Sequence, residues 1–207
     1  MLVRVPLHPS TPGDQTMVMP LPPLPLPRLT IDMLDDLPDD GTRYELLEGM
    51  LLVTPAPSNV HQVVATRLAT MLTIALRPSD EARVVAVGAI QRGKDTQLQP
   101  DVLVYPSVYP PTAHWREIRE WWLAVEVLSP SSRLYDREVK RGAYLLLGVQ
   151  EYWIANPADC SVEVWSRERS DGLRVTGELV WRPAPLDREI VIDLDDVFRD
   201  VCEGETD

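Results

Sequence analysis

Residues 122–128 of the chain set the strongest constraint on the fold. Their sequence, WLAVEVL, is apolar at every position except Glu126. A strand with apolar residues in succession is covered on both faces, as in the centre of an α/β sheet. Glu126 is therefore expected to be at least partly buried, and a buried carboxylate either takes up a proton or binds a cation. That cation is either a metal ion or a nearby arginine side chain.

Helical and strand patterns on both sides of this segment predict an α/β fold. Residues 60–75 have helical apolar spacing between a cap at Ser58 or Asn59 and Pro78. A second long helix is predicted from Ser131 or Ser132 to Leu147, with Gly148 as its C-cap. The order helix, three strands, helix, strand predicts a sheet with helices packed against it, and a parallel strand pair around the second helix.

Shorter elements are predicted from local signals. They are a short helix after Thr30, a hairpin at 44–53 turning near Glu48, strands at 82–90, 101–105, 152–155, 162–165 and 174–181, a turn at 91–100, and a helical turn in the C-terminal LDDVF. Residues 1–28 hold eight of the twenty prolines, which predicts an extended or disordered arm. We expect one domain over residues 29–200 and an acidic tail at 201–207.

Charge and cysteine content bear on partners and location. Residues 28–41 carry a net charge of −4 and residues 187–207 carry −7, which leaves −1 of the total −12 for the rest. A nearly neutral core lacks the basic face of a tight DNA binder, without excluding nucleic acid. Cys160 and Cys202 have no CxxC spacing and are interpreted as lone thiols in a reducing compartment. Without a signal-type or membrane-spanning apolar run, we expect a cytoplasmic protein.

Asp101 and Lys140 are the best candidates to act with Glu126. Asp101 follows Pro100 at the start of a predicted strand, so it could share one hard cation, Mg²⁺ or Mn²⁺, with Glu126 if the two strands are neighbours. A turn-capping aspartate is the alternative. Lys140 lies on a helical stripe with Asp136 and Tyr144, where it could lean over the carboxylates and stabilise charge on a phosphate. A solvated helix lysine is the alternative.

Several ordered motifs resemble one known family. They are QPDVLV at 99–104, LAVEVLSPSS at 123–132 with Asp136 and Lys140 after it, GVQEYWIANP at 148–157, the hairpin YELLEG at 44–49 and His61-Gln62. Over roughly residues 30–200 the chain resembles the Uma2 family of restriction-endonuclease-like proteins, within the PD-(D/E)XK nuclease superfamily. The resemblance implies a restriction-endonuclease-like core with an added N-terminal hairpin and C-terminal strands. It also implies a magnesium- or manganese-dependent endonuclease that hydrolyses phosphodiester bonds.

The resemblance assigns roles to individual residues. Asp101 and Glu126 match metal ligands, and Lys140 matches a migrated replacement for the lysine expected where Leu128 stands. Glu45 is either an auxiliary ligand or solvent-facing. His61 either reaches the site or helps to cap its helix, and the capping role is preferred.

Two further questions stay open at this level. The implied partner is nucleic acid, with DNA favoured over RNA, and a non-catalytic module that binds nucleic acid or protein is the alternative function. Trp121 and Trp122 belong either to the core or to the interface of a homodimer.

Overall fold

The computed structural model describes residues 28–78, 80–129, 135–169 and 171–202 as a mixed α/β fold with three sheets. The expected arm at 1–28, apart from Arg28, and most of the expected tail at 201–207 lie outside these ranges. The largest sheet has six strands in the order β10-β9-β8-β7-β6-β3. Their bounds are β3 Ala82–Ala86, β6 Val102–Pro106, β7 Trp121–Val127, β8 Val149–Asn156, β9 Ser161–Ser166 and β10 Leu173–Val175.

The centre of this sheet is the strand pair that the sequence predicts. β7 and β8 pair in parallel, as expected for strands joined by a helix, and the other neighbouring strands are antiparallel. All seven residues of β7 are buried. The register of β6 and β7 pairs Val102 with Val125, so that Asp101 lies opposite Glu126 one position further along.

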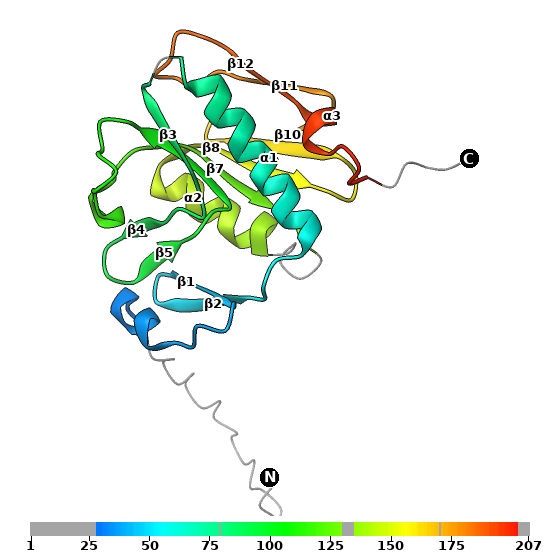
Figure 1. Cartoon of the computed structure of the whole chain (residues 1–207). Helices are drawn as coiled ribbons and strands as arrows, with labels where there is room; N and C mark the ends of the chain where they lie inside the picture. Colours follow the sequence, from blue (N-terminus) through cyan, green and yellow to red (C-terminus); the bar gives the residue numbers. More distant parts are fainter. Residues whose placement is uncertain (1–27, 79, 130–134, 170, 203–207) are drawn as a thin grey trace, which may run out of the picture.

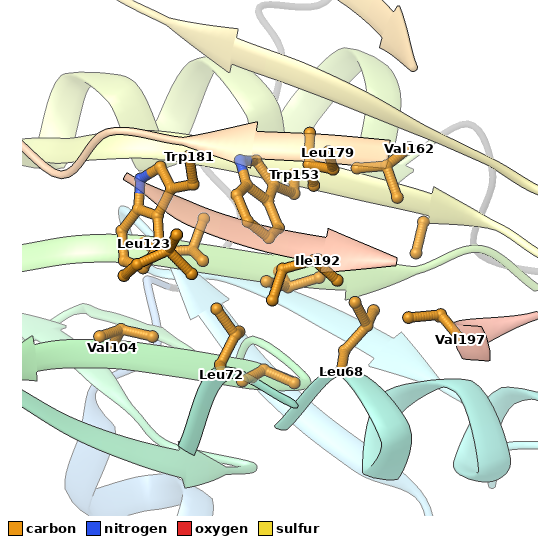
Figure 2. Packing of buried hydrophobic residues seen from close by; sticks show 14 of the residues in the cluster. Leu68, Leu72, Val104, Leu123, Trp153, Val162, Leu179, Trp181, Ile192 and Val197 are labelled. Atoms are coloured by element: carbon orange, nitrogen blue, oxygen red, sulfur yellow. The ribbon is translucent and has the colours of Figure 1, made fainter. Parts of the chain in front are cut away.

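One face of the sheet is covered by α1, Asn59–Leu76 (Figure 1). Ser58 caps this helix by accepting a hydrogen bond from the His61 backbone N–H. Leu68 and Leu72 of α1 pack against Leu123 and Trp153 of the sheet (Figure 2). The same apolar cluster continues into the two-stranded sheet of β11, Glu178–Trp181, and β12, Ile190–Asp193, and into α3, Leu194–Val197.

The opposite face of the sheet packs against α2, Arg141–Leu147. A π-helical turn, Tyr135–Lys140, leads directly into α2, and such turns are frequent at functional sites. Gly148 ends α2 in the left-handed conformation, with φ of 104°, as its predicted role as a C-cap requires. The predicted helix start at Ser131 or Ser132 lies outside the described residues.

A second, four-stranded sheet lies beside the start of β6 and the end of β7, where Asp101 and Glu126 stand. Its order is β2-β1-β5-β4, with β1 Arg43–Leu47, β2 Met50–Thr54, β4 Ile90–Arg92 and β5 Thr96–Leu98. The predicted hairpin is confirmed: β1 and β2 are joined by Glu48 and Gly49, which both have positive φ, as a type I′ turn requires. The 3₁₀ helix η1, Ile31–Asp36, stands where a short helix is expected, although the Thr30 side chain makes no capping bond.

Two predicted strands and one predicted turn are wrong, and backbone conformation explains the two strands. The expected strand at 82–90 ends at Ala86 because Val87 has φ of 55°, and the chain then enters the small sheet. The expected strand at 174–181 is divided at Gly177, with φ of 71°. The expected turn at 91–100 contains β5, whose three residues are too short a signal to recognise.

The interpretation of the cysteines as lone thiols is also wrong. Cys160 and Cys202 form a disulfide with a Cα–Cα distance of 6.1 Å, which joins the β8–β9 turn to the segment after α3. Two paired cysteines do not indicate a reducing compartment. Trp121 and Trp122 are 0% and 3% exposed, so they belong to the core and not to a dimer interface. Within the described ranges, no helix is long and apolar enough to span a membrane.

Candidate functional site

Asp101 stands at the entry to β6 with both carboxylate oxygens engaged. Its Oδ1 lies 2.8 Å from Arg43 Nη1, and its Oδ2 lies 3.0 Å from His61 Nε2. Oδ2 also accepts the backbone N–H of Val127 at 2.8 Å, which ties Asp101 to the neighbouring strand. Burial alone would raise the pKa of Asp101, but the bond from His61, the charge of Arg43 and the Val127 N–H together lower it to about 2. Asp101 is therefore an ionised, buried carboxylate.

Glu126 lies in the middle of the buried strand β7 and is 2% exposed. Its Oε1 accepts hydrogen bonds from Lys140 Nζ at 3.0 Å and from the Tyr144 hydroxyl at 2.7 Å. Both donors come from the chain that crosses over from β7 to β8, one from the last π-helical residue and one from α2. Burial and the charges of Glu126 and Glu45 raise the pKa of Tyr144 well above its ordinary value, so its hydroxyl stays a donor.

Glu45 extends the same network from β1 of the small sheet. Its side chain is fully buried, and Oε1 accepts the Gln99 backbone N–H at 2.7 Å. Oε2 lies 2.7 Å from Lys140 Nζ in an ion pair, although the angle there is not that of a hydrogen bond. Lys140, itself 3% exposed, therefore bridges Glu45 and Glu126.

Arg43 lies two residues before Glu45 on β1. Its Nη1 donates to the Gln99 carbonyl at 3.1 Å as well as to Asp101. Burial would lower the pKa of Arg43, but the carboxylates of Asp101, Glu126 and Glu45 raise it above its ordinary value. The site thus holds three carboxylates and three basic side chains within one buried network.

The structure brings together all five side chains that the sequence nominates. Glu45, His61, Asp101, Glu126 and Lys140 come from five separate segments and are each less than 10% exposed. The preferred capping role of the His61 side chain is wrong, because Ser58 supplies the cap and the imidazole contacts Asp101. The solvated alternatives for Lys140 and Glu45 are wrong as well.

Arg43 and Tyr144 also belong to the network, although the sequence does not single them out for it. Arg43 and Glu45 are two positions apart on one strand, so their side chains project to the same face, and this spacing is the signal that could identify Arg43. The helical stripe that joins Tyr144 to Lys140 does not distinguish a core tyrosine from a hydrogen-bond donor to Glu126. Leu128, which stands where the resemblance leads us to expect a lysine, is 4% exposed and packs in the core on the α2 side.

Comparison with known proteins assigns the family. The model of the Uma2 family, described as "Putative restriction endonuclease", matches residues 31–199. The chain belongs to the Uma2 family. No curated protein sequence matches this Uma2 protein.

A solved structure supports the same fold. This Uma2 chain is similar to a protein from Anabaena variabilis described as "a putative nuclease belonging to DUF820", with a TM-score of 0.63 and 20% sequence identity. The match covers 82% of the Uma2 chain and 97% of the solved one. Family and fold together suggest a nuclease.

The donor chemistry of the site suits the divalent cation that restriction-endonuclease-like families generally use. Glu45, Asp101 and Glu126 supply the carboxylate oxygens that Mg²⁺ and Mn²⁺ prefer. In this conformation Arg43, His61 and Lys140 contact these carboxylates instead, and the described residues contain no group of three His, Cys, Asp or Glu side chains arranged around one point. The Uma2 residues therefore fit such an ion in kind, provided that the basic side chains adjust.

Proposed function

We propose that this Uma2 protein is a metal-dependent nuclease that hydrolyses phosphodiester bonds in nucleic acid, with DNA as the favoured substrate. One observation carries the proposal: Lys140 Nζ lies within 3.0 Å of two buried carboxylates, Glu45 and Glu126, beside the ionised Asp101. A cluster of buried acids costs folding free energy unless cations balance it. Such a cluster is better explained by a chemical role than by stability.

In the proposed site, Asp101 and Glu126 hold the divalent ion, with Glu45 as an auxiliary ligand. The bound ion would lower the pKa of a water molecule and neutralise charge on the phosphate. Lys140 donates to Glu126, so its ammonium group would lie beside a phosphate bound to the same ion. There it would stabilise the negative charge that develops on the phosphate during attack. Tyr144 positions Glu126, because its hydroxyl donates to the same oxygen as Lys140.

The succession α1, β3, β6, β7, α2, β8 is the proposed nuclease core. It holds Asp101 and Glu126 on adjacent strands and Lys140 on the crossover that follows. The hairpin of β1 and β2 adds Glu45 and Arg43 from outside that core. Leu128 does not argue against catalysis under this proposal, because Lys140 brings an ammonium group to Glu126 from another element.

The test compares metal-dependent cleavage by the wild type and by Glu126→Gln. Glu120→Gln is the matched control, since Glu120 is an exposed acid on the same approach to β7 that bonds only the Trp122 indole among its described contacts. A labelled DNA duplex, a single-stranded DNA and an RNA of the same sequence are each incubated with excess Mg²⁺, with excess Mn²⁺ or with EDTA.

The proposal predicts cleavage by the wild type and by Glu120→Gln, dependent on the metal ion, and none by Glu126→Gln. Circular dichroism checks that all three proteins are folded. Full activity in Glu126→Gln would exclude the proposed site. A wild type that binds nucleic acid but cleaves none of the three substrates with either ion would instead assign the non-catalytic binding role.

A further inference from the structure

A divalent ion alone would add positive charge to a site that already holds basic side chains. Three carboxylates, Glu45, Asp101 and Glu126, contact Arg43, His61 and Lys140. A divalent ion bound among these side chains brings two further positive charges into a buried network. Buried net charge is costly, so the ion needs a compensating anion or the departure of a cation. A phosphodiester carries a negative charge and is such an anion.

Arg43 is the cation best placed to respond. Its side chain is 15% exposed, whereas those of Lys140 and His61 are 3% and 9% exposed. Both of its hydrogen bonds, to Asp101 and to the Gln99 carbonyl, come from Nη1. Nε and Nη2 donate to no acceptor among the residues that the structure describes. The guanidinium therefore has an outward edge with donors to spare.

A guanidinium and a phosphodiester match in geometry and charge. Two parallel N–H donors of arginine can bind two oxygens of one phosphate, and arginine keeps its charge at any working pH. The same Nη1 now occupies Oδ1 of Asp101, an oxygen that a bound metal ion would require. Metal and guanidinium therefore compete for Asp101, while phosphate and Asp101 compete for the guanidinium.

We propose that Arg43 is a phosphate-binding residue that moves from Asp101 to the substrate phosphodiester when a divalent ion binds. This exchange couples the two ligands: each binds more tightly when the other is present. Because binding couplings are reciprocal, the factor is the same in both directions. The inference rests on the proposed function and adds to it the residue that recognises the phosphate.

The experiment measures the two bindings separately in Arg43→Gln, which keeps some donors but has no charge. Calorimetry follows Mn²⁺ binding to DNA-free protein. Fluorescence anisotropy follows binding of a labelled 20-base-pair DNA duplex with and without Ca²⁺, an ion that shares the preference of Mg²⁺ for oxygen ligands, and a gel verifies that the duplex stays intact. The duplex length of about two helical turns gives a protein of this size room to bind.

The inference predicts opposite effects on the two ligands. Arg43→Gln binds Mn²⁺ about tenfold more tightly than the wild type, because its competitor for Asp101 is gone, and it loses most of the Ca²⁺-dependent gain in DNA affinity. A metal ligand would weaken Mn²⁺ binding when replaced, and a cation that only repels the metal ion would leave the Ca²⁺-dependent gain in DNA affinity intact, so the two changes together are diagnostic. Unchanged or weaker Mn²⁺ binding, or a full Ca²⁺-dependent gain in the variant, overturns the inference.

Two controls keep the result interpretable. Arg83→Gln removes another partly buried arginine, one that bonds the Tyr109 and Ser107 carbonyls away from the site, and it should leave both bindings unchanged. If Arg43→Gln does not fold, Arg43→Lys is measured, and it should show the same opposite changes with smaller size, because a lysine cannot form the paired bonds. A wild type that binds no metal with or without DNA contradicts the proposed function itself, whereas metal binding that is insensitive to Arg43 contradicts only the exchange.

Discussion

Lys140 donates to Glu126 across 3.0 Å from the crossover that follows the strand of Glu126. The same ammonium group lies 2.7 Å from Glu45, which belongs to a different sheet. One lysine thus joins the small sheet, the central sheet and α2 at a buried point. Because all three side chains are at most 3% exposed, solvent screens these contacts little, and each depends on the others.

Replacement of Lys140 by methionine should therefore destabilise the protein as well as abolish cleavage. Loss of one partner from a buried ion pair typically costs about 3–5 kcal/mol, since the carboxylates that remain are still buried but no longer have a cation beside them. Urea unfolding of metal-free protein measures the change in the free energy of unfolding. Arg141→Met is the control, because among the described residues the Arg141 guanidinium only stacks on Trp165, and its loss should cost about 1 kcal/mol or less. Equal stability of the two variants would contradict the bridging role of Lys140.

The hydroxyl of Tyr144 should matter for Glu126 without being needed for the fold. Tyr144→Phe removes only the donor at 2.7 Å from Glu126 Oε1 and keeps the ring in the core. A hydrogen bond to a charged group contributes about 1.5–3 kcal/mol. The free energy of unfolding and the free energy of Mn²⁺ binding should therefore each become less favourable by about that amount. Tyr109→Phe provides the comparison, since its hydroxyl accepts a bond from the Arg119 backbone near the surface. If Tyr144→Phe matches the wild type in Mn²⁺ affinity, Tyr144 does not position Glu126.

Asp101 should make the metal-free protein sensitive to acid. Its pKa is lowered from 3.8 to about 2 in the folded state, so the stability it contributes is present above pH 4 and is lost as the pH falls from about 4 to about 2. The shift corresponds to about 2 kcal/mol. The free energy of unfolding is measured in EDTA at pH 6 and at pH 2.5 for the wild type and Asp101→Asn. Because pH 2.5 is still above the folded-state pKa, part of the contribution remains there, and the wild type should lose about 1.5 kcal/mol more than the variant. Parallel losses would contradict the lowered pKa.

Reduction of the Cys160–Cys202 disulfide should lower stability and leave the site intact. The bond closes a loop with a sequence separation of 42 residues, and constraint of an unfolded loop of that size is worth about 2–4 kcal/mol. Thermal unfolding with and without dithiothreitol tests this on the wild type, with Cys160→Ser/Cys202→Ser as the reductant-insensitive control. Two free thiols in the unreduced, denatured protein would show that the bond does not form.

The central part of the fold could be predicted because its signals are strong and local. The uninterrupted apolar run around Glu126 marks a strand buried on both faces, and the spacing of α1 marks one buried stripe. Glycine and proline then set the ends of α1 and α2. The small sheet was harder, because β4 and β5 have three residues each and are held by pairing with a distant hairpin rather than by their own pattern.

Some residues of the candidate site could likewise be predicted from local patterns, whereas contacts between distant segments could not. Asp101, Glu126 and Lys140 stand out because each is a charged residue within or beside an apolar element. The contact of His61 with Asp101 depends on where α1 begins relative to β6, and no periodicity within α1 reports that. The pairing of Cys160 with Cys202 likewise depends on the return of the C-terminal segment to the β8–β9 turn, which sequence spacing does not reveal.

The most direct test of the proposed metal site is anomalous diffraction from crystals of the full chain soaked with Mn²⁺. The account predicts one anomalous peak within about 2.0–2.3 Å of carboxylate oxygens of both Asp101 and Glu126. It also predicts that Nη1 of Arg43 has left Asp101 in the same crystal. A peak that touches neither carboxylate, or no peak in a crystal whose Asp101 and Glu126 are open to solvent, would contradict the account.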